Sequence, residues 1–432
     1  MSLPRIRLAL HWQIALAIAL AALAGWTAGP GGAIFGLRWV SLFEFIGTLF
    51  INALKMIILP LIAASMIASI AGMGRGLARL GGRTLGFYLL TSSLAVLIGL
   101  AWVNLLSPGI SQGKPVGRVL ALGGQHAGVA ARLQASGSLG DLAAIFLRMI
   151  PTNVLSAAAD NGRILAVIFF SLLFGYALSR SSGPAIDTVR RFWEGIYQVM
   201  MRITGWIMRL APIGVFGLVA GVVAQTGFQA MRPLVWFSVT VLAALATHLF
   251  IVLPLLLLLF ARVRPYRLFR PMAPALLTAF STASSAATLP LTLKSVERAG
   301  ASRRTASFVL PLGATINMDG TALYECIAVI FLAQAYGVHL DLVTQLIIVV
   351  TAIATSIGVA GIPSASLVAI VVILNAVGLP AEAVGVLFVF DRILDMSRTA
   401  VNVYGDATCA LIVAYRERES GLLETSPDSL SG

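Results

Sequence analysis

Long apolar runs recur along most of the chain and are separated by short segments that carry arginines. About 20 apolar residues cross the hydrocarbon of a bilayer as a helix, and membrane barrels instead use shorter strands of alternating polarity. The continuous runs predict an all-α polytopic membrane protein with eight spans, at 8–28, 41–72, 84–107, 164–179, 196–224, 234–261, 305–336 and 380–414.

The first run follows Arg5 and Arg7 and is open to two interpretations, a signal peptide or a retained helix. Its length exceeds an apolar signal region of about 7 to 15 residues, which favours the retained helix. An N-terminus inside the cell places most arginine clusters on one side, and the positive-inside rule assigns that side to the cytoplasm. Both termini are then predicted to be cytoplasmic, and residues 109–163 form a long external connection.

Two further apolar stretches, 271–297 and 343–377, are interrupted in the middle by segments rich in Ser, Gly and Pro. Each half is too short to cross alone, and irregular backbone survives at membrane depth only where protein or a water-filled cavity surrounds it. Paired interruptions of this kind indicate the binding site of a secondary transporter. We therefore predict two re-entrant hairpins; two kinked structural helices are the alternative.

Acidic residues are concentrated in the C-terminal third of the chain. Up to residue 260 only Glu44 falls within a span, whereas the last two spans contain Asp319, Glu325 and three further aspartates. At about 100° per residue, one face of the last helix carries five polar residues, namely Asp391, Asp395, Arg398, Asn402 and Asp406. Because each ionisable residue at mid-membrane costs about 2.5 to 3.5 kcal/mol, we predict a functional face rather than a set of internal ion pairs.

The seventh span contains a polar cluster, Gly313–Ala322, that is predicted to unwind the helix locally. Unwound carbonyls beside Asn and Asp oxygens suit a hard cation. A half-helix that begins near Ser284 or Ser285 would point its amide groups into the predicted binding site. A half-helix that begins at Pro363 would do the same. Such helix ends attract carboxylates, so the substrate is predicted to carry them.

These residues resemble the glutamate/aspartate and dicarboxylate:cation symporter family over nearly the whole chain. The most specific motifs are Ser284–Pro290, Asn317–Thr321, Gly358–Pro363 and Asp391–Asp406. The resemblance implies an inverted-repeat, elevator-type transporter that is a homotrimer in a bacterial inner membrane and is not an enzyme. It divides the chain into scaffold helices 1 and 2 at 1–83, helix 3 of the transport unit and the external connection at 84–163, helices 4 to 6 at 164–262, re-entrant hairpin 1 at 263–302, helix 7 at 303–338, re-entrant hairpin 2 at 339–378, and helix 8 with a cytoplasmic tail at 379–432.

The resemblance also implies residue roles. The substrate residues are Ser284, Ser285, Thr321, Ile362, Asp391, Asp395, Arg398, Thr399 and Asn402. Arg398, assisted by Thr321, takes the side-chain carboxylate of the substrate. Asp395 and Thr399 take its amino group, and Asn402 with the tip around Ser285 takes its α-carboxylate.

Three sodium sites follow from the same resemblance. The first uses carbonyls of Gly313, Asn317 and Asn402 with the carboxylate of Asp406. The second uses Tyr88, Thr91, Ser92, Asn317 and Asp319. The third uses the Thr315, Ser356 and Ile357 carbonyls beside the Met318 sulfur.

Glu325 occupies the position of the proton carrier in animal relatives. The alternative is that Glu325 is a protonated, hydrogen-bonded glutamate with a structural role only. Many relatives carry a second arginine at the place of Ala283 or of Met396, and this chain has neither.

The leading hypothesis is a symporter of glutamate or aspartate with Na⁺ and H⁺, in which Na⁺ is co-transported and not a prosthetic group. C4-dicarboxylate carriers lack the aspartate matching Asp395, and neutral amino-acid carriers lack the arginine matching Arg398. An anion channel and an intramembrane hydrolase are the alternatives from other classes, although the sequence has neither an HExxH motif nor a P-loop. Partners are expected to be lipid and further copies of the chain. Nucleic acid is not expected despite the net charge of +13, because no basic patch carries interleaved aromatics.

Overall fold

The computed structural model describes residues 10–34, 37–71, 78–120, 122, 150–159, 164–227, 231–338, 340–357 and 365–423. Helices dominate these residues, as the apolar runs predict. The strands of the described ranges form two short antiparallel hairpins, β1 (Ala33–Ile34) with β2 (Leu37–Arg38) and β3 (Ile110–Ser111) with β4 (Lys114–Pro115).

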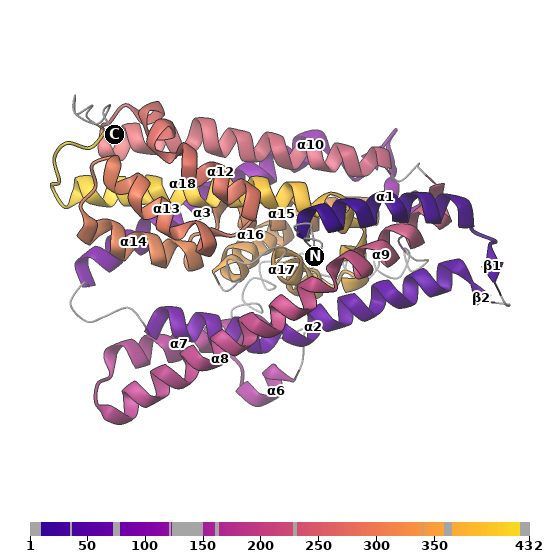
Figure 1. Cartoon of the computed structure of the whole chain (residues 1–432), viewed down its shortest axis with the longest axis horizontal. Coiled ribbons are helices and arrows are strands. Elements are labelled where there is room, and N and C mark those ends of the chain that lie inside the picture. The colour runs from indigo at the N-terminus through magenta and orange to yellow at the C-terminus, as the bar shows by residue number, and fades with distance from the viewer. Residues whose placement is uncertain are drawn as a thin grey trace, which may run out of the picture.

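One group of helices, the N-terminal group, consists of α1 (Leu10–Ala28), α2 (Trp39–Ala71), α6 (Val154–Ala158), α7 (Ile164–Arg180), α8 (Pro184–Arg209) and α9 (Ala211–Thr226). Helix α2 packs against α7, α8 and α9, and α1 lies along α9 (Figure 1). Small residues allow these close approaches: a Cβ at Gly25 would lie 2.6 Å from the carbonyl oxygen of Ala220. The absence of side-chain bulk at such positions is typical of helices that pack within membranes.

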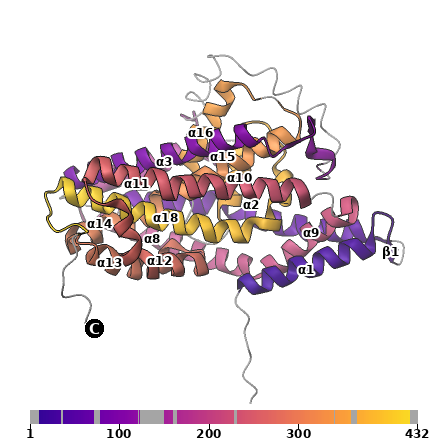
Figure 2. The same cartoon turned by 90° about the horizontal axis from the view of Figure 1, so that it is seen from above.

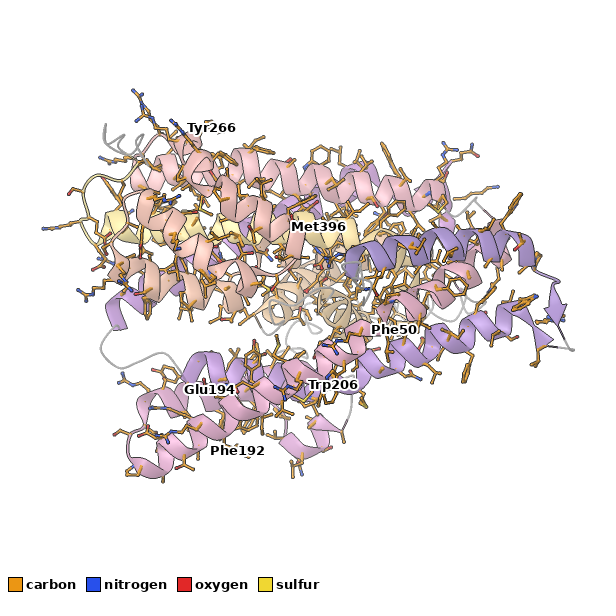
Figure 3. The ribbon with its side chains drawn as sticks, viewed as in Figure 1. Phe50, Phe192, Glu194, Trp206, Tyr266 and Met396 are labelled. Carbon is orange, nitrogen blue, oxygen red and sulfur yellow. The ribbon has the colours of Figure 1, made fainter. Side chains whose placement is uncertain are left out.

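The predicted span at 196–224 comprises the second half of α8 and most of α9, which are bent by 51° at the break between them. Pro212 lies in the first turn of α9, where its missing N–H is tolerated, and this explains the new helix start. Helix α8 is amphipathic, and its Phe192 and Trp206 are exposed (Figure 3).

The second group, the C-terminal group, surrounds α15 (Asp319–Ala335) and α18 (Phe388–Arg416). Around them lie α3 (Ala78–Leu106), α10 (Met231–Thr247), η5 (His248–Val252), α11 (Leu253–Leu256), η6 (Leu257–Ala261), α14 (Arg303–Ile316), the helix pair α12 (Phe269–Thr282) and α13 (Ser285–Arg298), and the helix pair α16 (Leu342–Ser356) and α17 (Ala365–Ala376). Short 3₁₀ helices connect them, η2 (Val116–Arg118), η7 (Pro265–Leu268) and η8 (Ala381–Leu387). Figure 2 shows α18 running between α10 and the pair α12–α13.

Both predicted helix interruptions occur in this group. Between α12 and α13, Ala283 adopts a left-handed conformation (φ 50°), and the Ser284 hydroxyl caps α13 by accepting from the Ala287 amide at 3.2 Å. Helix α13 therefore begins at Ser285, as expected. The second interruption separates α16 from α17; residues 358–364, with Ile362 and Pro363, lie outside the described residues.

The seventh predicted span is interrupted too. Helix α14 ends at Ile316 and α15 begins at Asp319, which leaves Asn317 and Met318 in non-helical conformations. The polar cluster thus unwinds as predicted. Gly320, just after the break, contacts α18 closely enough that a Cβ there would lie 2.7 Å from the Arg398 carbonyl oxygen.

The segment that follows α18 folds back on the start of α14. Glu419 accepts hydrogen bonds from the Ser302 amide (2.7 Å), the Ser302 hydroxyl (2.6 Å) and the Thr305 hydroxyl (2.5 Å). Leu423 donates its amide to the Ala299 carbonyl at 2.8 Å. This C-terminal strap, residues 417–423, ties the end of α18 to the junction between α13 and α14.

In the described part of the chain, three helical stretches are long and apolar enough to cross a membrane, at Leu80–Leu106, Met231–Ala261 and Arg303–Ala335. The bent pair α8–α9 is a fourth if it forms one span. The shorter apolar helices, including α16 and α17, pack among them. The chain is therefore a helical membrane protein.

Candidate functional site

The polar face of α18 is buried in the C-terminal group. Its five predicted members are each between 0% and 7% exposed. The face contacts α15 and the unwound segment before it, while α12 and α13 pack against the same helix. The charged side chains thus lie inside the protein, where each needs a partner or a ligand.

Arg398 is the centre of this face and is fully buried. Its Nη2 donates to Asp391 Oδ1 at 3.1 Å and to Asp395 Oδ1 at 2.9 Å, and its Cζ lies 3.8 Å from the centre of the Tyr324 ring. The Nε and Nη1 atoms of Arg398 are buried and have no hydrogen-bond partner among the described residues. A guanidinium keeps its charge in proteins and has five N–H donors, so these two atoms remain available to a further acceptor.

Asn402 connects α18 to the first turn of α15. Its Oδ1 accepts from the Gly320 amide at 2.8 Å, and its Nδ2 donates to the Thr321 hydroxyl at 3.1 Å. Thr399 donates to the Asp395 carbonyl at 2.8 Å and keeps its hydroxyl lone pairs. Of the hairpin tip, Ser285 is buried on α13, which packs against α18. The structure therefore gathers the described substrate residues around α18.

A second polar cluster joins α3 to the unwound segment. The Thr91 hydroxyl donates to Asn317 Oδ1 at 3.0 Å, and the Ser92 hydroxyl donates to Asp319 Oδ1 at 2.8 Å. Asn317 Nδ2 donates to Asp406 Oδ1 at 3.0 Å. Two predicted sodium sets thus meet at Asn317, with Asp319 on one side and Asp406 on the other.

Tyr88 and Gly313 complete this cluster. The Tyr88 hydroxyl donates to the Val309 carbonyl at 2.6 Å. A Cβ at Gly313 would collide with Asp406 Oδ1 and would lie 2.8 Å from the Tyr88 hydroxyl oxygen. Glycine is therefore required at position 313 to bring the carboxylate and the phenol together.

The third predicted sodium set is less closely connected. Thr315 donates to the Leu312 carbonyl at 2.9 Å, and Ser356 donates to the Ile353 carbonyl at 2.9 Å, so both hydroxyls bond to their own helices. Met318 is buried and Ile357 is half-buried. Among the described residues, no hydrogen bond joins these four residues to one another. Residues 358–364 lie outside the described ranges.

The donors of these sets suit Na⁺ better than a transition metal. Among the described residues, no three His, Cys, Asp or Glu side chains come together as a metal-binding group. Apart from the Met318 sulfur beside the third set, the predicted ligands are carboxylate, amide, hydroxyl and carbonyl oxygens, which hard cations prefer.

His248 is a residue that the sequence argument missed. Its Nε2 lies 3.2 Å from Asp319 Oδ2, and both side chains are fully buried. A histidine within an apolar span was the available signal, because ionisable groups at membrane depth are functional candidates. The pairing itself joins residues 71 positions apart in sequence.

Glu325 is fully buried on α15 and faces α16. Its Oε2 accepts from the Thr355 hydroxyl at 2.9 Å, and its Oε1 has no hydrogen-bond partner in the described part of the chain. Thr355 on α16, which could also not be identified from the sequence, provides this contact.

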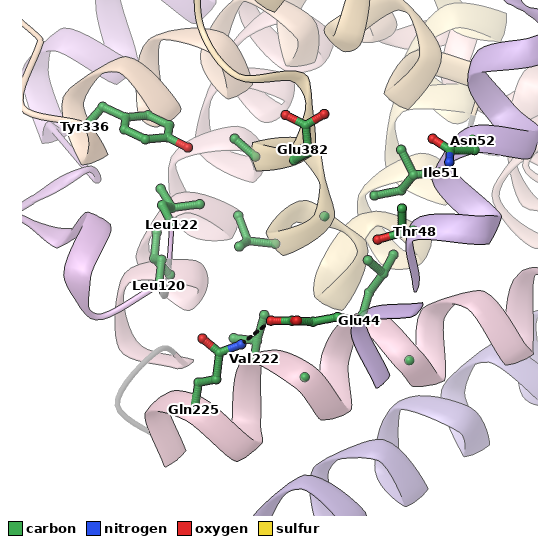
Figure 4. A pocket seen from close by; sticks show the side chains of 16 residues that line it. Glu44, Thr48, Ile51, Asn52, Leu120, Leu122, Val222, Gln225, Tyr336 and Glu382 are labelled. Carbon is green, nitrogen blue, oxygen red and sulfur yellow. Dashed lines mark hydrogen bonds between the residues drawn. The ribbon is translucent and has the colours of Figure 1, made fainter. Parts of the chain in front are cut away.

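A separate cavity of about 230 Å³ lies between α2 and α9 of one group and η8 of the other (Figure 4). Glu44 and Glu382 line it, and Gln225 donates to Glu44 at 2.8 Å. None of the predicted substrate or sodium residues lines this cavity. It belongs to the contact between the two helix groups rather than to the site on α18.

Broken helices that hold buried ionic side chains are characteristic of secondary transporters. The family model described as the sodium:dicarboxylate symporter family matches residues 10–416, and the chain belongs to this family. Membership makes it a symporter.

Three relatives illustrate the similarity. The proton/glutamate-aspartate symporter of Escherichia coli (strain K12) is 34% identical over 416 residues, which cover 96% of this chain and 94% of that protein. The proton/sodium-glutamate symport protein of Geobacillus stearothermophilus is 30% identical over 417 residues, 95% of each chain. The neutral amino acid transporter B(0) of Homo sapiens is 36% identical over 422 residues, 90% of this chain and 77% of that protein.

Proposed function

We propose that this protein imports L-glutamate and L-aspartate together with Na⁺ and H⁺. The observation that carries the proposal is the state of Arg398, which is fully buried with Nε and Nη1 unpartnered. A buried donor without a partner costs about 1 to 3 kcal/mol, and more when it is charged. A carboxylate on the substrate side chain would satisfy these donors, whereas an apolar side chain would not.

The remaining groups suit the other end of an amino acid. Asp395 and Thr399 offer a carboxylate and hydroxyl lone pairs to the α-amino group. Asn402, Thr321 and the amides that begin α13 at Ser284 and Ser285 offer donors to the α-carboxylate. Asp391 accepts a hydrogen bond from Arg398 Nη2, and Asp391 and Ile362 are proposed as further substrate residues. Two of the relatives are named as a glutamate-aspartate symporter and a glutamate symport protein, which supports this substrate class.

Asp406 and Asp319 are the proposed sodium carboxylates. Neither bonds to an arginine or lysine among the described contacts, and both lie beside amide and hydroxyl oxygens. Sodium would neutralise the two carboxylates, so that substrate and cation load together. The Thr315, Met318, Ser356 and Ile357 set is proposed as a third sodium site.

Glu325 is the proposed proton carrier. It lies in a buried environment that favours the neutral form, and its single described bond comes from Thr355. Glu325 would carry a proton into the cell with the substrate. It would be charged only while the empty carrier returns.

An elevator mechanism is proposed for the movement. The helix groups of the structure support it, because α3 and α10 to α18 pack mainly on one another, while α2, α7, α8 and α9 form a separate set. The first set would be the mobile transport unit, with α12–α13 and α16–α17 as its two re-entrant hairpins. The second set would hold a homotrimer, with eight spans per chain and both termini in the cytoplasm of a bacterial cell.

Substrate binding by the purified protein tests this proposal. At saturating Na⁺, calorimetry should detect L-aspartate and L-glutamate but not L-alanine, and substitution of choline for Na⁺ should abolish the heat. Equal binding of L-alanine, or binding independent of Na⁺, would contradict the proposal.

A further inference from the structure

The hydroxyl group of Thr355, which bonds to Glu325, has more acceptors than hydrogens. Its Oγ1 lies 2.9 Å from Glu325 Oε2, 2.8 Å from the Thr351 carbonyl oxygen and 3.2 Å from the Ala352 carbonyl oxygen. A threonine hydroxyl has one hydrogen to donate and two lone pairs that accept. The hydroxyl therefore donates either to its own helix, α16, or to the carboxyl group on α15.

The protonation state of Glu325 decides which direction this hydrogen takes. A protonated carboxyl group is a donor, so Glu325 Oε2 can donate to the Thr355 hydroxyl, whose own hydrogen then goes to the Thr351 carbonyl. An ionised carboxylate only accepts, so the hydroxyl hydrogen then turns to Oε2. The Thr351 carbonyl keeps a partner in both cases, because it accepts from a backbone amide within the helix. Thr355 thus offers a partner to both forms of Glu325.

The two carboxyl oxygens of Glu325 are not equivalent. Oε2 faces the Thr355 hydroxyl, whereas Oε1 is buried and has no hydrogen-bond partner in the described ranges. A proton on Oε2 finds an acceptor, and a proton on Oε1 finds none among these residues. A buried polar group without a partner is unfavourable, so the geometry favours Oε2 as the atom that holds the proton.

The charged surroundings of Glu325 come mainly from α18. Arg398 of that helix, itself paired with two aspartates, acts on Glu325 electrostatically, and Cys326 is its titratable neighbour on α15. Helices α16 and α17 carry no acidic or basic residue, α3 and α10 carry theirs in the first two turns, and Arg118 of η2 is exposed. Arg398 is proposed to bind the substrate, whereas Thr355 is not part of the proposed substrate site.

We propose that Thr355 is the positioning residue for the transported proton: its hydroxyl accepts from Glu325 Oε2 in the loaded carrier and donates to the carboxylate in the empty carrier. On the cytoplasmic side the O–H bond at Oε2 breaks, the proton passes to water, and the hydroxyl turns from the Thr351 carbonyl to the carboxylate. No other covalent bond changes. This inference rests on the proposed function, because it takes Glu325 as the proton carrier.

Transport of labelled L-aspartate by the purified full-length protein in proteoliposomes tests the inference. Exchange against internal L-aspartate does not need the empty carrier to return, whereas net uptake into substrate-free vesicles does. Thr355→Val removes the hydroxyl from a side chain of the same shape, and exchange should stay within about threefold of the wild type. Net uptake should fall at least about tenfold, because the carboxylate of the empty carrier loses a hydrogen bond to a charged group.

The response to internal pH separates this role from a merely structural one. In Thr355→Val a rise of about one unit in internal pH should restore net uptake, because one proton is released and a tenfold deficit corresponds to one pH unit. Thr355→Ser keeps a hydroxyl and should match the wild type within about threefold. Thr351→Val is the matched control, because this buried threonine lies one turn earlier on α16 and its hydroxyl donates to the Ile347 carbonyl at 2.8 Å. Neither assay should change by more than about threefold in this control.

A double variant separates the contact with Glu325 from packing. Glu325→Gln removes the titrating group, so Glu325→Gln and Glu325→Gln/Thr355→Val should show the same net uptake within about threefold. Thr355→Cys serves if Thr355→Val does not fold. Its S–H group is a weak donor, so its net uptake should lie between those of the serine and valine variants.

Three results would overturn the inference: an unchanged ratio of net uptake to exchange in Thr355→Val, a deficit that a higher internal pH does not reduce, or a further loss of net uptake in the double variant. Wild-type net uptake that ignores an imposed pH gradient would instead overturn the proton coupling of the proposed function.

Discussion

Replacement of Arg398 by glutamine removes the cation that is proposed to hold the side-chain carboxylate. The guanidinium is fully buried and bonds to Asp391 at 3.1 Å and to Asp395 at 2.9 Å. Loss of one partner of a buried charge pair costs about 2 to 5 kcal/mol of binding. Since about 1.4 kcal/mol corresponds to a factor of ten, the dissociation constant of L-aspartate should rise by about 30-fold to several-thousand-fold.

The assay is calorimetric or competition binding at saturating Na⁺, with L-serine measured beside L-aspartate. L-Serine has no side-chain carboxylate, so its binding should not weaken, and the preference for the acidic substrate should disappear. Arg398→Lys should be intermediate, because an ammonium group is a point charge that cannot reproduce the planar guanidinium contacts. L-Aspartate affinity within about threefold of the wild type, in a variant that remains monodisperse, would refute the assignment of Arg398.

Three further predictions concern the ions and the strap. Asp406→Asn should raise the Na⁺ concentration needed for L-aspartate binding, because a carboxylate ligand beside Asn317 is lost; an unchanged Na⁺ dependence would remove Asp406 from the sodium site. Glu325→Gln should keep substrate exchange across proteoliposomes but make net uptake insensitive to an imposed pH gradient, and a variant that responds like the wild type would exclude Glu325 as the proton carrier. For Glu419, partial burial alone would raise the pKa, but the hydrogen bonds from Ser302 and Thr305 outweigh burial and hold the pKa below its ordinary value. Its stabilisation is therefore fully present above the unfolded carboxyl pKa of about 4.3 and is lost as the pH falls through the lower folded pKa, so thermal unfolding of Glu419→Gln should depend less steeply on acid pH than that of the wild type.

The features that follow from one helix could be predicted from the sequence. The buried face of α18 follows from 3.6 residues per turn, and the break at Asn317 follows from polar and glycine residues within an apolar run. The start of α13 at Ser285 follows from a serine cap. In each case the information lies within a few neighbouring residues.

The features that depend on tertiary contacts could not be predicted in this way. Hydropathy does not distinguish one tilted span from the bent pair α8–α9, because the apolar run continues through the break at Leu210. The contact of His248 with Asp319 depends on how η5 packs against the start of α15. Arg392 could not be identified from the sequence, because a charged residue at the edge of the polar face is expected to be solvated. Its approach to Asp395 depends on how the side chain is placed.

Uptake by proteoliposomes tests the central claim most directly, namely that buried carboxylates couple Na⁺ to an acidic amino acid. An inward Na⁺ gradient should drive labelled L-aspartate above its external concentration, and dissipation of that gradient should release it. Equilibration without accumulation, at a rate that does not depend on Na⁺, would contradict the account.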